Sequence, residues 1–179
     1  QNTLWWIEEA GIDALRIDTY TYPNQNFMAR LNKVVRTHYP RMVLFGETWV
    51  HNHQSQAYFA GGFPLRPSDN RLNYVTDFQT YFALKETVTK ASGWNEGVGK
   101  LYQSLAGDYL YQDPYRLVTF ADNHDEGRYF GLCGEDLRKY KLGLTLLYTL
   151  RGIPCLYYGT ELLMKSTENH GTMREDVPG

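Results

Sequence analysis

Charged side chains stand where two short apolar segments of the sequence end. Arg16 and Asp18 close the segment IDALRID (12–18), and Glu47 closes MVLFGE (42–47). Charged groups at the end of an apolar run are costly to bury unless they are paired or used in chemistry. Residues two apart on a strand share a face, so the Arg16 guanidinium lies beside Asp18 and keeps it ionised. The pair fits either an activated nucleophile or a structural ion pair.

The two segments together favour a specific chemistry. If they are neighbouring strands, which lie ~4.8 Å apart, Asp18 and Glu47 are separated by about 5 Å. This is the separation of the two carboxyl groups in enzymes that cleave glycosidic bonds with retention of configuration. Burial and a neighbouring negative charge favour the protonated form of Glu47, so it suits the role of general acid. The sequence therefore predicts Asp18 as nucleophile and Glu47 as acid/base.

A third polar group follows the apolar run RLVTFA (116–121). It consists of Asp122, Asn123, His124, Asp125 and Glu126. In βα folds the carboxyl ends of the strands face the active site. We therefore expect His124 and Asp125 to lie at the same edge as Asp18 and Glu47.

The elements that must position these residues alternate along the chain. Apolar strand patterns are found at 12–18, 42–47, 72–77, 116–121 and 153–158, and helical patterns at 3–10, 24–39, 78–90, 95–106 and 135–150. This order predicts the α/β class with parallel βα units. Residues 51–70 carry many Gly, Pro, Ser, Asn and His without a period, which predicts a long loop. Asp77, after the third strand, is a further candidate for a cleft wall.

Composition excludes several classes of protein. The 179 residues carry a net charge of −2 with both signs interspersed, so we expect no nucleic-acid partner. No apolar run reaches the ~18 residues of a membrane span. Two cysteines do not make a disulfide framework or a zinc motif. Fifteen tyrosines suggest surfaces suited to sugar rings. The chain starts inside a helix and ends in a loop, so both ends look cut.

Four blocks in order resemble one family. GIDALRID, FGETW, FADNHD and GIPCLYYGTEL are similar to the fourth, fifth, seventh and eighth barrel strands of the α-amylase family, glycoside hydrolase family 13. The resemblance covers essentially the whole chain and is nearest to the neopullulanase- and cyclomaltodextrinase-like α-amylases of Bacteroidetes. It implies a (β/α)8 TIM barrel, of which residues 1–179 form a single partial domain, the C-terminal half with strands four to eight and their helices.

The resemblance also assigns roles to individual residues. It implies a retaining glycoside hydrolase that cleaves α-1,4-glucosidic bonds in starch-type glucans. Asp18 matches the nucleophile, Arg16 its arginine partner and Glu47 the general acid/base. Asp125 matches the third carboxylate, which grips and distorts the sugar, and His124 matches a histidine that hydrogen-bonds the same ring.

Aromatic side chains after the strand ends are candidates for stacking on sugars. Tyr22 and Trp49 are the strongest of these. Thr21 and Tyr22 stand where many α-amylases have a Lys-His pair. For four other aromatic residues, anchoring of a loop is at least as good a reading: Tyr20, Tyr58, Tyr129 and Phe130.

The expected partners are an oligo- or polysaccharide, specifically an α-glucan, and the missing N-terminal half of the barrel. We expect no cofactor and no metal site from this chain, with calcium left open for the complete enzyme. The resemblance favours a periplasmic or secreted bacterial protein. Two alternatives stay open: an α-glucan transglycosylase on the same scaffold, and a non-catalytic carbohydrate-binding or assembly homologue, which the three carboxylates disfavour. Because five strands cannot close a barrel of eight, we expect residues 1–179 alone to be inactive.

Overall fold

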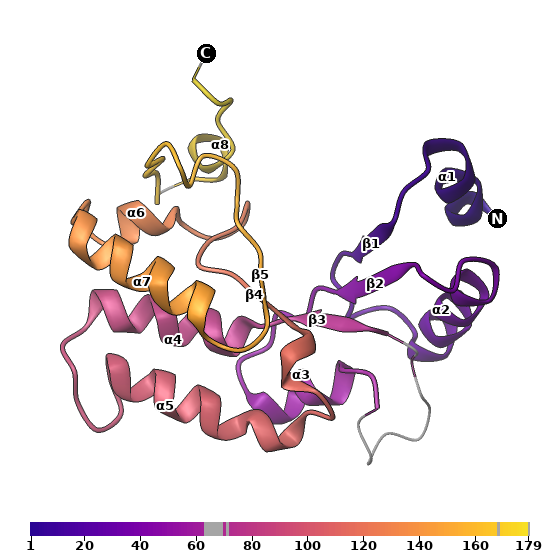
Figure 1. Cartoon of the computed structure of the whole chain (residues 1–179), viewed down its shortest axis with the longest axis horizontal. Helices are drawn as coiled ribbons and strands as arrows, with labels where there is room; N and C mark the ends of the chain where they lie inside the picture. The colour runs from indigo at the N-terminus through magenta and orange to yellow at the C-terminus, as the bar shows by residue number, and fades with distance from the viewer. Residues whose placement is uncertain (63–69, 71, 168, 179) are drawn as a thin grey trace. The chain divides into compact units, whose positions relative to one another are not determined.

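The computed structural model describes residues 1–62, 70, 72–167 and 169–178. It forms two compact units, each described by itself below (Figure 1). The first unit comprises residues 1–76 and 109–117, and the second comprises residues 77–108 and 118–179. Part of the long loop expected over residues 51–70 lies outside the described residues, at 63–69.

The first unit is built on parallel strands in the order β1, β2, β3. Arg16 of β1 is aligned with Phe45 of β2, and Phe45 with Tyr74 of β3. The elements are α1 (Asn2–Ala10), β1 (Ala14–Ile17), α2 (Gln25–His38), β2 (Val43–Gly46), α3 (His53–Phe59), β3 (Tyr74–Thr76) and the 3₁₀ turn η2 (Pro114–Arg116). The three strands and the helices α1 and α2 confirm the prediction from sequence.

Helix α2 covers one face of these strands. The Asn24 side chain caps the helix by accepting hydrogen bonds from the backbone N–H groups of Asn26 and Phe27. Val35 of α2 is fully buried, and Leu15 and Ile17 of β1 pack against the same apolar core. Because successive side chains of a strand point to opposite faces, Arg16 faces away from this helix.

The segment after β1 is held against the end of β2. The Tyr20 N–H donates to the Glu47 carbonyl at 3.0 Å, and the Glu47 N–H donates to the Ile17 carbonyl at 2.9 Å. The Tyr20 ring is fully buried, and a Cβ at Gly46 would lie only 2.6 Å from it. Glycine at position 46 therefore lets Tyr20 pack closely beside Glu47.

Helix α3 lies within the segment that was expected to be a loop. The Asn52 side chain accepts a hydrogen bond from the Ser55 N–H and caps the helix, while Gln56 and Ala57 are fully buried. The segment lacks a clear apolar period because Gln56 is buried as a polar residue, donating to the Tyr111 hydroxyl at 2.9 Å. The prediction of a structureless loop was wrong over residues 53–59.

The second unit packs helices beside two short parallel strands. Helices α4 and α5 lie side by side (Figure 1). The elements are α4 (Phe78–Thr89), α5 (Val98–Ala106), β4 (Leu117–Thr119), α6 (Tyr129–Leu132), α7 (Leu137–Thr149), β5 (Ile153–Pro154) and α8 (His170–Met173), with the 3₁₀ turn η1 (Gly107–Leu110) where the chain returns to the first unit. Val118 of β4 is aligned with Ile153 of β5. The strand expected over 153–158 is limited to its first two residues.

A buried ion-pair network fastens the start of α4. Asp77 is fully buried and caps the helix by accepting a hydrogen bond from the Thr80 N–H at 3.1 Å. Arg151 donates to Asp77 at 2.6 Å and to Asp108 at 2.7 Å. Asp77 is therefore a structural residue of this unit and does not form a cleft wall.

We predict that Arg151→Met strongly destabilises the protein. Removing this guanidinium leaves the Asp77 carboxylate buried without its charged partner, which costs about 3–5 kcal/mol of unfolding free energy. Chemical denaturation of the full-length protein measures the loss. The matched control is Arg138→Met, because Arg138 pairs with Asp136 while its side chain is 93% exposed. Equal effects of the two substitutions would contradict a buried network.

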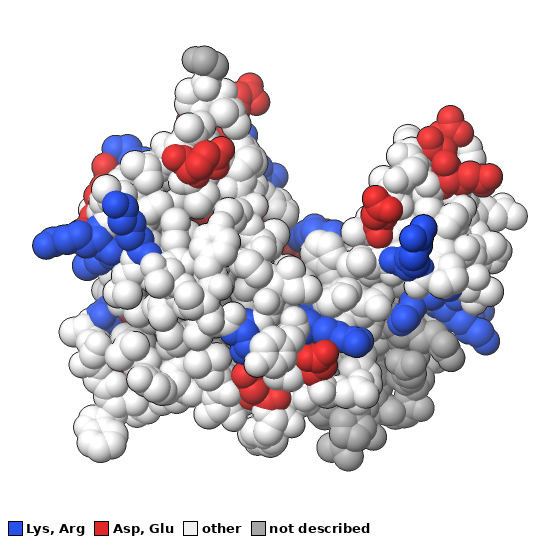
Figure 2. All heavy atoms as spheres, in the orientation of Figure 1, with Lys and Arg blue, Asp and Glu red and all other residues white. Residues whose placement is uncertain are grey.

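One face of the molecule carries charges of both signs (Figure 2). On the face drawn in Figure 2, Lys and Arg side chains are interspersed with Asp and Glu, and neither sign forms a continuous stripe. Among the described residues, no helix combines the length and the apolar character needed to cross a membrane.

Candidate active site

In the first unit, one guanidinium binds both predicted catalytic carboxylates. Arg16 Nη1 donates to Asp18 Oδ1 at 2.8 Å, and Arg16 Nη2 donates to Glu47 Oε1 at 2.5 Å. The strand register explains this arrangement, because Ile17 is aligned with Gly46 and the residues that follow them come out side by side. The structure thus brings Arg16, Asp18 and Glu47 together, as the sequence predicts.

The two carboxylates differ in their surroundings. The Asp18 side chain is 64% exposed, whereas that of Glu47 is 5% exposed. The second oxygen of Glu47, Oε2, accepts a hydrogen bond from the Thr19 N–H at 2.9 Å. A small molecule can therefore approach Asp18 directly. The Arg16 guanidinium and the Thr19 N–H thus hold the Glu47 carboxyl group in place from two sides.

In the second unit, most of the polar residues 122–126, which follow β4, stabilise the loop in which they lie. Asp122 is buried and accepts a hydrogen bond from the Tyr129 N–H at 2.9 Å. Burial raises the pKa of Asp122 to about 6, although the Tyr129 N–H and the Arg128 charge oppose this shift. The Asp122 carboxyl therefore keeps its proton to a higher pH in the folded chain than in the unfolded chain. Its contribution to the free energy of unfolding is lost as the pH rises from about 4 through about 6.

Two further members of that group stabilise the same turn. The Asn123 side chain accepts hydrogen bonds from the N–H groups of Asp125 and Glu126, each at 2.9 Å. Glu126 accepts a hydrogen bond from the Tyr81 hydroxyl at 2.5 Å and lies 3.5 Å from Lys85 Nζ. Burial and the Glu126 carboxylate raise the pKa of Tyr81 well above its ordinary value, so Tyr81 stays a donor.

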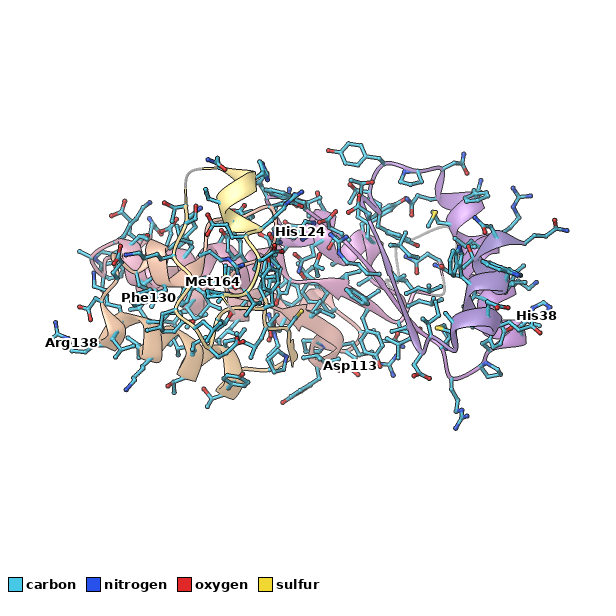
Figure 3. The ribbon with its side chains drawn as sticks, turned by 90° about the horizontal axis from the view of Figure 1, so that it is seen from above. His38, Asp113, His124, Phe130, Arg138 and Met164 are labelled. Carbon is cyan, nitrogen blue, oxygen red and sulfur yellow. The ribbon has the colours of Figure 1, made fainter. Side chains whose placement is uncertain are left out.

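His124 and Asp125 form the accessible part of this loop. His124 Nε2 lies 3.1 Å from Asp125 Oδ2, and Arg174 Nη2 donates to Asp125 Oδ1 at 2.6 Å. Arg174 Nε also donates to the His124 carbonyl at 2.9 Å, and His170 Nδ1 lies 3.8 Å from Asp125. Figure 3 shows His124 near the short helix α8.

Arg174 and His170 are absent from the sequence-based set of site residues. They follow the last strand, in a short helix and an irregular segment with no apolar period. A single Arg in such a segment carries no pattern that ties it to Asp125, so the contact becomes visible only in three dimensions.

The predicted aromatic residues divide by burial. Tyr22 is 83% exposed and Trp49 is 39% exposed, so ring surface remains accessible in the segments that follow β1 and β2. Tyr20 is fully buried and Tyr129 is 1% exposed. For Tyr20 and Tyr129 the anchoring reading therefore holds.

Among the described residues, no group of three or more His, Cys, Asp or Glu side chains could hold a metal ion.

A sequence profile of the α-amylase catalytic domain matches residues 2–178. The chain belongs to the α-amylase family. A cyclomaltodextrinase of Bacillus sp. is 30% identical over 159 residues, which are 88% of this chain and 26% of that relative. A cyclomaltodextrin glucanotransferase of Geobacillus stearothermophilus is 30% identical over 162 residues, 89% of this chain and 21% of that relative.

Solved structures of α-amylases are also similar to this chain. The crystal structure of an Anoxybacillus α-amylase matches 95% of this chain with a TM-score of 0.82 and 29% identity, and the match covers 36% of that chain. The chain thus spans about a quarter of the length of the curated relatives it matches. These findings confirm the α/β fold with parallel strands, the partial α-amylase barrel and a domain of the glycosidase class. The position among Bacteroidetes enzymes stays a prediction.

Proposed function

We propose that the protein carrying this chain is a retaining glycoside hydrolase that cleaves α-1,4-glucosidic bonds in starch-type glucans. One observation carries the proposal: Asp18 and Glu47 share the Arg16 guanidinium, with Asp18 exposed and Glu47 buried. An accessible carboxylate beside a desolvated one is the pairing that nucleophile and acid/base require.

The reaction proceeds in two steps. Glu47 gives its proton to the glycosidic oxygen as an oxygen of Asp18 attacks the anomeric carbon, so the leaving sugar departs and a glycosyl ester forms on Asp18. Glu47 then takes a proton from water, whose oxygen attacks the same carbon and releases Asp18 as a carboxylate. Atoms and charges balance with the two side chains and water alone, so we propose no cofactor for these steps.

The remaining predicted residues bind the sugar. His124 and Asp125 bind hydroxyl groups of the sugar, as the family resemblance implies, and the exposed rings of Tyr22 and Trp49 stack on sugars. Arg16 orients the Asp18 carboxylate through its hydrogen bond at 2.8 Å. Support for an α-glucan substrate comes from the family and from the cyclomaltodextrinase and α-amylase relatives.

The configuration of the first product tests this proposal. We predict that the full-length protein releases the α-anomer from an α-linked maltooligosaccharide, because two displacements at one carbon restore its configuration. Proton NMR at early times, before mutarotation, distinguishes the anomers. The β-anomer as first product would contradict the assignment of Asp18 as nucleophile.

A second candidate is transfer of the glycosyl group to another sugar in place of water. The observation in its favour is the cyclomaltodextrin glucanotransferase relative, which is as similar to this chain as the cyclomaltodextrinase, at 30% identity each. Incubation with one pure maltooligosaccharide separates the two functions. A transferase makes products longer than its substrate, or cyclic ones, while a hydrolase makes only shorter chains.

A non-catalytic homologue is disfavoured. An exposed carboxylate and a buried one on the same guanidinium are the arrangement that the two-step reaction needs. The three carboxylates Asp18, Glu47 and Asp125 are all retained in this chain.

A further inference from the structure

The C-terminal segment of the second unit is fastened to the loop that carries His124 and Asp125. Arg174 binds the Asp125 carboxylate and the His124 carbonyl, at 2.6 and 2.9 Å. The Arg128 N–H donates to the Ser166 carbonyl at 2.9 Å. The segment is therefore attached to the loop at two places, at residues 124–125 and at residue 128.

The attachment at residue 128 is supported by the buried side chain of Arg128. The Arg128 side chain is 1% exposed, and its guanidinium carbon lies 3.9 Å from the Tyr157 ring centre and 4.7 Å from that of Tyr158. Arg128 Nη1 also donates to the Tyr158 carbonyl. These contacts fix the position of Tyr158.

Tyr158 in turn holds the residue next to Arg174. Its hydroxyl donates to the Glu175 carbonyl at 2.8 Å. The contacts thus run from the 124–128 loop through Arg128 and Tyr158 to Glu175, and return through Arg174 to Asp125. A guanidinium whose backbone is held in this way has little freedom to leave the carboxylate.

We propose that Arg174 is a positioning residue that orients the Asp125 carboxylate toward the sugar; this inference rests on the proposed function. Arg174 occupies one oxygen of Asp125 and His124 approaches the other. A carboxylate has about four acceptor positions, so each oxygen keeps one for a sugar hydroxyl. Arg174 binds a side chain and a backbone carbonyl of the same loop through two different nitrogens, Nε and Nη2, a geometry that the single nitrogen of a lysine does not reproduce.

The test is a double-mutant cycle in the full-length protein, with kcat and KM measured on a maltooligosaccharide. Arg174→Gln is expected to lower kcat about 10–100-fold and to change KM less than about threefold, because a misplaced group costs rate at the reacting centre. Combined with Asp125→Asn, it is expected to add no further loss, because both changes remove the same function. Arg174→Lys is expected to restore part of kcat.

A matched control and a stability measurement separate positioning from folding. Arg138→Gln removes an arginine that also pairs with an aspartate, but on the exposed side of α7. It should leave kcat within about twofold of wild type, as expected for a surface ion pair. Thermal unfolding shows whether each variant is folded, and if Arg174→Gln is not, Arg174→Lys takes its place in the cycle.

Three outcomes would overturn the inference. The first is wild-type kcat in Arg174→Gln. The second is a double variant whose loss is the product of the two single losses, which would show that Arg174 does not act through Asp125. The third is a wild-type protein without activity on α-glucans, which removes the proposed function itself and is recognised before any variant is made.

Discussion

Asp18→Asn in the full-length protein is expected to lower kcat/KM on α-glucans by about 10⁴-fold or more, which is the scale of losing a catalytic nucleophile. The amide that replaces the carboxylate cannot form the glycosyl ester. Folding should be nearly unchanged. The Asp18 side chain is 64% exposed, and the loss of a solvent-exposed ion pair costs at most about 1 kcal/mol.

Asp13→Asn is the matched control for this experiment. Asp13 lies just before β1 and is exposed, and its backbone carbonyl accepts a hydrogen bond from the Val43 N–H at 3.0 Å. Steady-state kinetics of both variants, with thermal unfolding, makes the comparison. If purified Asp18→Asn kept more than a tenth of wild-type activity, Asp18 would not be the nucleophile.

Glu47→Gln is expected to separate natural from activated substrates. A general acid contributes about 10²–10⁴-fold, and the loss should be near the upper end for a maltooligosaccharide, whose leaving group needs a proton. An α-glucosyl fluoride needs no proton to leave, so glycosylation of Asp18 should remain fast and the second step should become slow. The time course of fluoride release is expected to show a burst followed by slow turnover.

The same substitution should also destabilise the first unit locally. Both Glu47 oxygens accept hydrogen bonds, from Arg16 and from the Thr19 N–H. In glutamine one of these positions becomes an NH₂ group that faces another donor, which costs about 1–3 kcal/mol when buried. Glu8→Gln on the exposed face of α1 is the control, with no change expected on either substrate. Equal losses of Glu47→Gln on natural and activated substrates would contradict the acid assignment.

The sequence predicts the site well where one strand decides the position of a residue. The short apolar runs at 12–18 and 42–47 are strands, and parallel pairing places the residues after Ile17 and Gly46 side by side. The sequence does not show that Arg16 binds Glu47 as well as Asp18. That contact depends on the distance between the strand ends, which only the packed structure provides.

Burial of the aromatic residues illustrates why other features could not be predicted. Tyr20 and Tyr22 follow the same strand, yet one ring is fully buried and the other is 83% exposed. Gly46 provides the space for Tyr20, and Gly143 provides it for Tyr129, because a Cβ at Gly143 would lie 2.1 Å from the Tyr129 hydroxyl oxygen. Such partners are distant in sequence, so no local pattern reveals them.

The contact between Arg174 and Asp125 is a second feature of this kind. The two residues are separated by 49 positions, and Arg174 lies beyond the last strand in a segment without periodicity. Its role depends on Arg128 and Tyr158, which hold the segment in place. The sequence motif around His124 and Asp125 therefore identifies the loop but not the group that orients it.

The most direct test of the central claim is the mass of the peptide that contains Asp18 after the full-length Glu47→Gln protein has reacted with an α-glucosyl fluoride. The slow second step should allow the glycosyl ester to accumulate. Peptide mapping at low pH is expected to find one glycosyl group on Asp18, and none in the Asp18→Asn, Glu47→Gln double variant. A glycosyl group on any other residue, or continued turnover with unmodified Asp18, would contradict the account.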